Sequence, residues 1–143
     1  MEIPKKKFAS VHNLDDAFER ELKAACRPLT FISETDAEVT PFTAEKPSNR
    51  SLSGYLASLE ITSDNIEEVG FEEFFDRLTS EKDWHGPREK KRSQQWSKLR
   101  GVLEENLESL RVIRVGRIQL EIFIAGMDAT GRLAGVKTKA IET

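Results

Sequence analysis

Cysteine and histidine are scarce in this 143-residue chain, with one cysteine and two histidines. The single Cys26 excludes an intrachain disulfide, and His12 and His85 cannot by themselves form a common zinc site. No apolar run approaches the ~20 residues of a membrane-spanning helix, and the lysine-bearing N-terminus lacks the apolar segment of a signal peptide. We therefore expect a cytoplasmic, soluble protein that is held together by packing alone.

The usual signatures of catalysis are also missing. The sequence shows no clear nucleophile–base pair, no clear pair of catalytic carboxylates and no clear metal-binding cluster. Gly126, Gly131 and Gly135 are spaced for a hairpin and not for a nucleotide-binding loop. Cys26 ends an amphipathic helix, far from the helix N-terminus that would activate a thiol, so a buried structural role is favoured. We expect no enzymatic activity, no cofactor and no metal of the protein's own.

Net charge is only −3, but the charges are unevenly distributed. Residues 51–76 hold seven acids and no base, whereas residues 82–100 hold seven bases and two acids. The basic block, with Trp84 and Trp96 as stacking rings, raises the hypothesis of nucleic-acid binding. The negative net charge opposes it, and Trp96 belongs to an apolar helix stripe. We interpret the block as a solvated helix face.

Hydrophobic periodicity predicts helices at residues 13–26, 71–78 and about 88–109. Asn13 is a candidate cap for the first, and Pro28 lies beyond its end. In the second, the apolar residues stand at i, i+3, i+4 and i+7, which predicts a core stripe. Its members are Phe71, Phe74, Phe75 and Leu78.

Shorter apolar and alternating stretches predict strands, many of them in the last third of the chain. A turn at residues 33–36 should leave Glu34 exposed, and Pro41 confines its strand to a sheet edge or an irregular position. The predicted strands are 39–44, 55–61, 112–115, 118–124 and 133–141, with a short apolar run at 29–32, a loop at 46–54 and hairpin turns at 116–117 and 128–131. This order indicates one α+β domain with helices packed on a mainly antiparallel sheet.

Several motifs, taken together, resemble the nuclease A inhibitor family. The closing stretch 132–143 reads RLAGVKTKAIET, and the likeness also covers Phe31-Ile32-Ser33-Glu34, Phe74-Phe75-Asp76-Arg77, Asp83-Trp84 and Val115-Gly116. It extends over nearly the whole chain apart from residues 43–68. The resemblance implies an inhibitor domain at 13–143 after an N-terminal extension at 1–12, folded as a three-layer α/β/α sandwich similar to pathogenesis-related-1-like proteins.

The resemblance also implies a function and a binding site. It suggests a one-to-one complex between a free monomer and a magnesium-dependent, sugar-non-specific nuclease of the ββα-metal class, without direct contact to nucleic acid or membrane. The family's contact positions fall on Glu34, Trp84 and Thr143, with Asp83 and Glu142 beside them. Thr143 would approach the magnesium ion that the nuclease contributes.

Two features depart from the family pattern. Residues 85–91 are basic where an acidic stretch is expected, and residues 43–68 do not align. A basic segment beside a basic nuclease cleft would repel it, which keeps open an interaction module of the same fold with a non-nuclease partner. Each site residue also has a purely structural explanation. Ser33 and Asp36 could serve merely to shape a turn, Trp84 could pack under its own loop, and Thr143 could belong to a frayed chain end.

Overall fold

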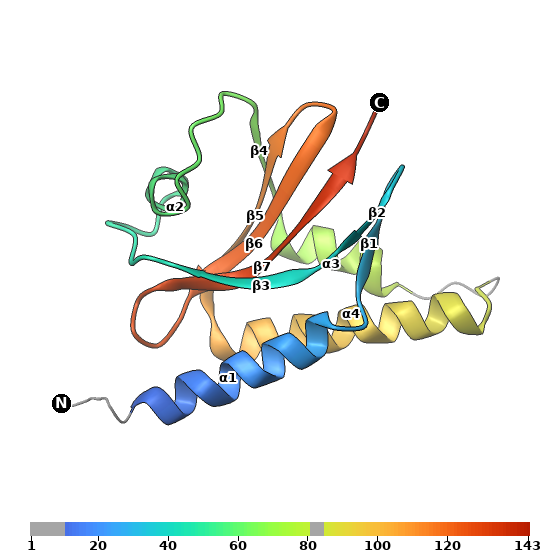
Figure 1. Ribbon diagram of the computed structural model, residues 1–143, viewed down its shortest axis with the longest axis horizontal. Coiled ribbons are helices and arrows are strands. Elements are labelled where there is room, and N and C mark those ends of the chain that lie inside the picture. Colours follow the sequence, from blue (N-terminus) through green and yellow to red (C-terminus); the bar gives the residue numbers. More distant parts are fainter. Residues whose placement is uncertain (1–10, 81–84) are drawn as a thin grey trace.

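The structure is a computed structural model that describes residues 11–80 and 85–143. This part of the chain forms four helices and seven strands (Figure 1). In order they are α1 (Val11–Cys26), β1 (Thr30–Ile32), β2 (Asp36–Glu38), β3 (Thr40–Ala44), α2 (Leu52–Ser58), β4 (Ile66–Val69), α3 (Phe71–Thr79), α4 (Pro87–Asn106), β5 (Glu108–Gly116), β6 (Gln119–Met127) and β7 (Leu133–Ile141).

The central sheet has five antiparallel strands in the order β3-β7-β6-β5-β4. Tight turns join β5 to β6 and β6 to β7, and they use Gly116 and Gly131 at φ of 117° and 91°, values that suit glycine. β3, which contains Pro41, lies at the edge as predicted. β1 and β2 form a separate hairpin with Ile32 opposite Asp36. The α+β class with an antiparallel sheet is thus confirmed.

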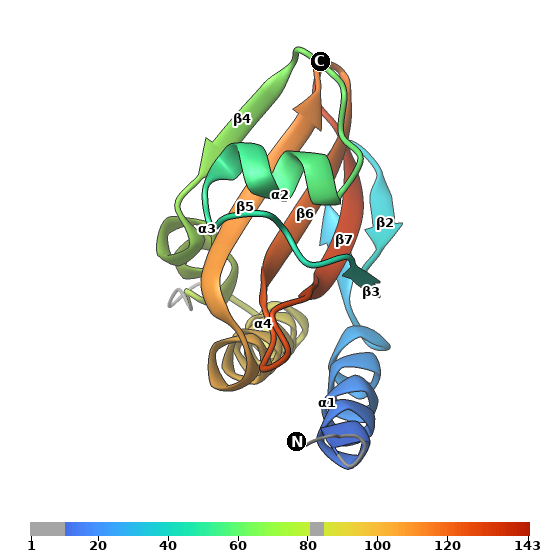
Figure 2. The ribbon, with the colours of Figure 1, turned by 90° about the vertical axis from the view of Figure 1, so that its left-hand side faces the viewer.

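Apolar side chains are buried on both faces of this sheet. On β6, Ile122 and Ile124 join the core formed with α1, α3 and α4, whereas Phe123 and Ala125 join a second cluster with Tyr55 of α2. Figure 2 shows α2 lying across its face of the sheet. The run of buried residues in β6 follows from this double cover. The finer expectation of a pathogenesis-related-like three-layer sandwich stays a prediction.

The three predicted helices are present, with shifted ends. The phenylalanine stripe of α3 packs in the core, where Phe75 and Trp96 are fully buried and meet edge to face at 6.1 Å. α1 begins at Val11, so the prediction of Asn13 as its cap was wrong. α4 ends at Asn106 rather than near residue 109, because the chain extends at Leu107 to start the longer strand β5.

Residues 43–69 contain one wrong prediction and one strand that was not predicted. Residues 52–58 form helix α2, where a strand was predicted at 55–61, because Leu52, Tyr55, Leu56 and Leu59 have helical spacing and pack together against the sheet. The Ser51 side chain caps this helix by accepting from the Gly54 amide. Strand β4 was not predicted, since its central pair of glutamates reads as loop.

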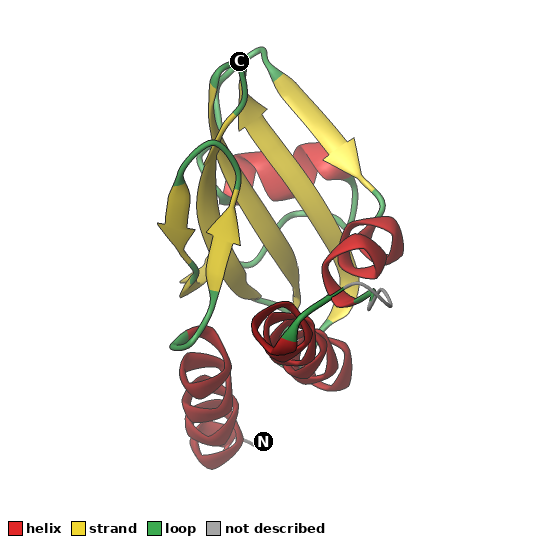
Figure 3. Ribbon diagram, turned by 90° about the vertical axis from the view of Figure 1, so that its right-hand side faces the viewer, coloured by secondary structure: helices red, strands yellow, loops and turns green. Residues whose placement is uncertain are grey.

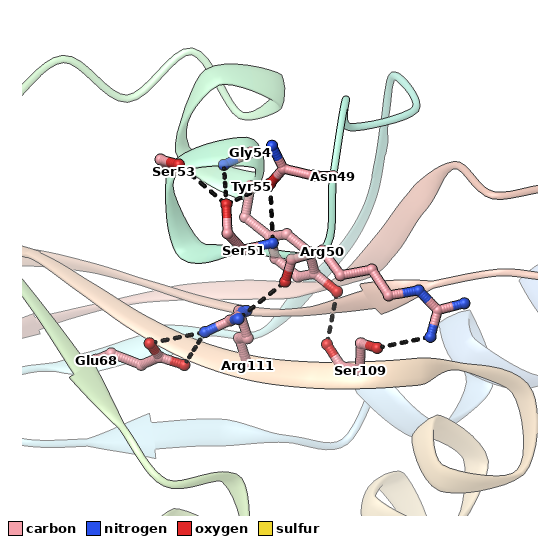
Figure 4. Close-up of polar contacts among 9 residues, drawn as sticks. All are labelled: Asn49, Arg50, Ser51, Ser53, Gly54, Tyr55, Glu68, Ser109 and Arg111. Atoms are coloured by element: carbon pink, nitrogen blue, oxygen red, sulfur yellow. Dashed lines mark hydrogen bonds and ion pairs between the residues drawn. The ribbon is translucent and has the colours of Figure 1, made fainter.

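A polar network fastens α2 to the sheet (Figure 4). The hydroxyl of buried Tyr55 donates to the Ser109 carbonyl at 2.6 Å. Arg111 lies over the Tyr55 ring at 5.3 Å, donates to both Glu68 carboxylate oxygens at 2.9 and 2.7 Å, and donates to the Arg50 carbonyl at 2.8 Å. The network therefore joins α2, β4 and β5 across the part of the chain that the sequence described least well.

Candidate functional site

Three segments that are far apart in the sequence meet where β7 ends. Figures 1 and 3 show the C-terminus between the tip of the β1–β2 hairpin and the β5–β6 turn. The Ile141 amide donates to Ser33 Oγ at 3.0 Å, and the Glu34 amide donates to the Ile141 carbonyl at 3.3 Å. On the other side, the Glu142 amide donates to the Ile118 carbonyl at 2.9 Å. We call this region, residues 32–35, 117–118 and 141–143, the tip.

Glu34 and Thr143 bind each other at the tip. The Thr143 amide donates to Glu34 Oε2 at 2.7 Å, and the Thr143 hydroxyl lies 2.9 and 2.8 Å from the two carboxylate oxygens. These bonds favour the charged carboxylate, and the backbone bond followed by the hydroxyl bond lowers the pKa of Glu34. Both residues remain exposed. The structure thus brings together two of the residues singled out in the sequence, and we call this pair the Glu34–Thr143 clamp.

The hairpin turn explains why Glu34 reaches the tail. Ser33 accepts from the Thr35 amide through Oγ, and its own amide donates to the Thr35 carbonyl at 2.9 Å. This local bonding folds the chain sharply between β1 and β2 and leaves Glu34 at the apex. Ser33 therefore has both roles, because it shapes the turn and also holds the last residue of β7.

Arg114 is a tip-supporting residue that the sequence reasoning missed. Its Nη2 donates to Glu142 Oε1 at 2.5 Å, and its Nε lies 3.7 Å from Glu67 Oε1. The Arg114 side chain is 22% exposed, whereas its partner Glu142 is 49% exposed, so the pair lies at the surface. Alternation along β5 could have placed the Arg114 side chain on the same face as Val112, which α3 and α4 cover. Its partner Glu142 could not have been predicted in the same way, because that contact joins distant segments.

Asp83 and Trp84, which the resemblance marks as contact residues, lie outside the described residues. His85, the next residue, is half-buried and lines a cavity of about 190 Å³ together with Ile32 of β1. Trp84 and Asp83 therefore stay predictions. Glu142, the fifth predicted contact residue, is exposed at the tip and bound to Arg114.

A family model described as nuclease A inhibitor-like protein matches residues 16–143. The chain belongs to the nuclease A inhibitor-like family. The match includes residues 43–68, which the resemblance of individual motifs did not cover, so α2 and its network lie inside the family domain. A search of curated proteins finds no match. Membership of this family suggests a nuclease-inhibiting role and a protein that is not an enzyme.

The charge blocks of this nuclease A inhibitor-like protein are partly neutralised within the fold. From the acidic segment 51–76, Glu68 pairs with Arg111, and Asp76 pairs with Arg100 of the basic block at 2.9 Å. Trp96 is 1% exposed and cannot stack on a base. Arg88, Lys90 and Lys91 remain exposed on the first turns of α4. The interpretation of Trp96 as a core residue is confirmed.

Two further observations concern metals and membranes. Within residues 11–80 and 85–143, no three or more histidine, cysteine, aspartate or glutamate side chains gather as they would around a metal ion. In the same part of this inhibitor-like chain, no helix has the length and apolar character needed to cross a bilayer.

Proposed function

We propose that this nuclease A inhibitor-like protein blocks a magnesium-dependent, sugar-non-specific endonuclease by placing the Glu34–Thr143 clamp in its active site. The observation that supports this most strongly is the clamp itself, which joins residues 109 positions apart at an exposed end of the molecule. The rest of the tip then holds the chain end in one conformation. A tail that is ordered before binding loses less conformational entropy when it enters a cleft.

The oxygen atoms of the clamp suit a site built for a phosphodiester. The Thr143 hydroxyl uses its hydrogen on Glu34, which leaves its oxygen lone pairs to face outward. Magnesium prefers oxygen ligands and keeps exchangeable waters, so the hydroxyl of Thr143 can approach the nuclease's own ion. We propose that this ion comes from the nuclease and that the inhibitor supplies only part of its surroundings.

Glu34 contributes negative charge beside the chain end. Its bonds to Thr143 keep the carboxylate ionised and leave acceptor positions for an arginine of the nuclease. Such a contact strengthens when the complex excludes water. Glu34 and Thr143 would together replace substrate oxygens, which is inhibition by mimicry of the phosphodiester.

Trp84, with Asp83 beside it, is the proposed aromatic anchor. This assignment rests on the family resemblance and on the frequency with which tryptophan dominates interface energies, where truncation can cost ~2 kcal/mol or more. We further propose that the inhibitor is a cytoplasmic monomer that forms a one-to-one complex with the nuclease. It would contact no nucleic acid itself and would protect the nucleic acids of its own cell.

Digestion of plasmid DNA tests the proposal. A ββα-metal nuclease and magnesium are mixed with wild type, Glu34→Ala, Trp84→Ala or a chain that lacks Thr143, and the remaining supercoiled DNA is measured. We expect wild type to block digestion and each variant to lose at least tenfold in potency. Glu38→Ala is the matched control, because Glu38 is an exposed glutamate of the same hairpin that stands outside the clamp. Undiminished digestion with wild type would refute the function.

The exposed bases Arg88, Lys90 and Lys91 favour a second candidate, an interaction module of the same fold with a non-nuclease partner. They would oppose a basic nuclease cleft if they faced it. Affinity capture from native cells with wild type and Glu34→Ala distinguishes the two. A nuclease that is retained by wild type and lost with the variant supports inhibition, whereas an unrelated protein retained by both supports the module.

A further inference from the structure

Two large aliphatic side chains in the described part of the chain are exposed, and both stand at the tip. Ile32 is 47% exposed at the end of β1, and Ile118 is 57% exposed in the β5–β6 turn. Residues 141–143 run between them, since Ser33 binds Ile141 on one side and the Ile118 carbonyl accepts from Glu142 on the other. An isolated exposed isoleucine needs no explanation, but two that flank the same charged clamp do.

Neither isoleucine is buried, although Ile32 lines the cavity that it shares with His85 and Trp96. In β1 the neighbouring Phe31 points inward, stacking on Phe74 and meeting Trp96 edge to face, so Ile32 projects to the other side of the strand. Ile118 holds the tail through its backbone carbonyl, which any residue would provide. Its position in a turn ordinarily favours a polar side chain. About half of each isoleucine is therefore available for an external contact.

We propose that Ile32 and Ile118 pack against apolar side chains at the rim of the nuclease cleft, one on each side of the Glu34–Thr143 clamp. This inference rests on the proposed function and extends its contact surface. Apolar contacts around a polar centre exclude water from it, and charge-assisted bonds strengthen when water leaves. The isoleucines would thus add their own burial and also strengthen the bonds of the clamp.

The charge of the tip selects among possible occupants. A second copy of the chain would place one exposed Glu34 carboxylate against another, and like charges repel, whereas Glu142 is already paired with Arg114. Glu34 at the centre of the tip would likewise repel a nucleic acid or an anionic bilayer, although exposed Arg117 lies beside Ile118 in the same turn. A protein surface with a cationic centre and an apolar rim satisfies both the carboxylates and the isoleucines.

Substitutions that keep the backbone preferences test this contact. Ile32→Thr retains β-branching, and Ile118→Asn places a turn-favouring residue in the turn. Gln119→Ser is the control, since Gln119 is an exposed polar neighbour of Ile118. Binding to nuclease A, the enzyme in the family's name, is measured by calorimetry at about 0.05 M and about 0.5 M salt, alongside thermal melting of each free variant.

We expect each isoleucine variant to bind about tenfold more weakly and the double variant about a hundredfold more weakly, with most of that loss retained at the higher salt concentration. The effect of Glu34→Gln should shrink at high salt, because it removes a charge. If neither isoleucine substitution changes the affinity measured for the wild type, this inference is overturned and the proposed function stands. Absence of binding by the wild type would overturn both.

Discussion

Ser33→Ala should loosen the chain end without altering any residue of the clamp. Ser33 Oγ accepts from the Ile141 amide at 3.0 Å, donates to the Thr35 carbonyl at 3.2 Å and accepts from the Thr35 amide at 3.4 Å. Alanine removes all three contacts and adds no bulk. The Ile141 amide then loses its partner at the point where β7 turns into the tail.

The size of the effect follows from these contacts. The bond to Ile141 is neutral, has good length and is partly buried, so its loss costs about 1 kcal/mol of unfolding free energy. The two turn contacts within residues 33–35 are longer and weaker. For a domain of this size the loss lowers Tm by about 3 °C. Because Glu142 and Thr143 keep their other bonds, only part of their backbone freedom returns, and we expect affinity for the nuclease to fall about fivefold.

Urea unfolding and nuclease-inhibition titrations measure the two effects. Ser97→Ala is the matched control, because Ser97 is exposed on α4 and alanine favours a helix. The control should keep both stability and inhibition. If Ser33→Ala inhibits as well as wild type while its stability falls, the ordered tail does not contribute to binding and our reasoning about preorganisation is wrong.

Three further predictions concern acid, the α2 network and the thiol. Because the pKa of Glu34 is lowered in the folded protein, the clamp is present above the ordinary value of 4.5 and is lost as the pH falls through the folded value. The NMR shift of the Thr143 amide should therefore titrate below pH 4.5, and a midpoint at or above 4.5 would contradict this. Tyr55→Phe keeps the buried ring but removes the hydrogen bond to the carbonyl of exposed Ser109. Chemical denaturation should show a loss of about 1 kcal/mol of unfolding free energy with unchanged inhibition, whereas a loss near zero would mean that water fully replaces the hydroxyl. Burial raises the pKa of Cys26 to about 12. A thiol reagent at about pH 8 should therefore label Cys26 only after denaturant is added, and labelling of the folded protein would refute its burial.

Local patterns predicted much of the fold because their physical cause is local. The stripe around Phe75 and the alternation in β6 reflect which face of an element is buried, and that period is written in the sequence. The same reasoning failed at Tyr55, where a short apolar run suited a strand as well as a helix. The Ser51 cap and the second sheet face decided for the helix, and only the assembled sheet provides that face.

For the candidate site, the sequence by itself determined which groups are present: an acidic turn residue at Glu34, a hydroxyl-bearing residue at Thr143, and the motifs of the family. It could not place them together, because they lie 109 positions apart and meet through the pairing of β7 with distant strands. Tertiary structure alone decided that Arg114 holds Glu142, that Ser33 holds Ile141, and that Ile32 and Ile118 flank the clamp. Contacts between distant segments depend on how the whole sheet closes, and no local pattern of residues encodes them.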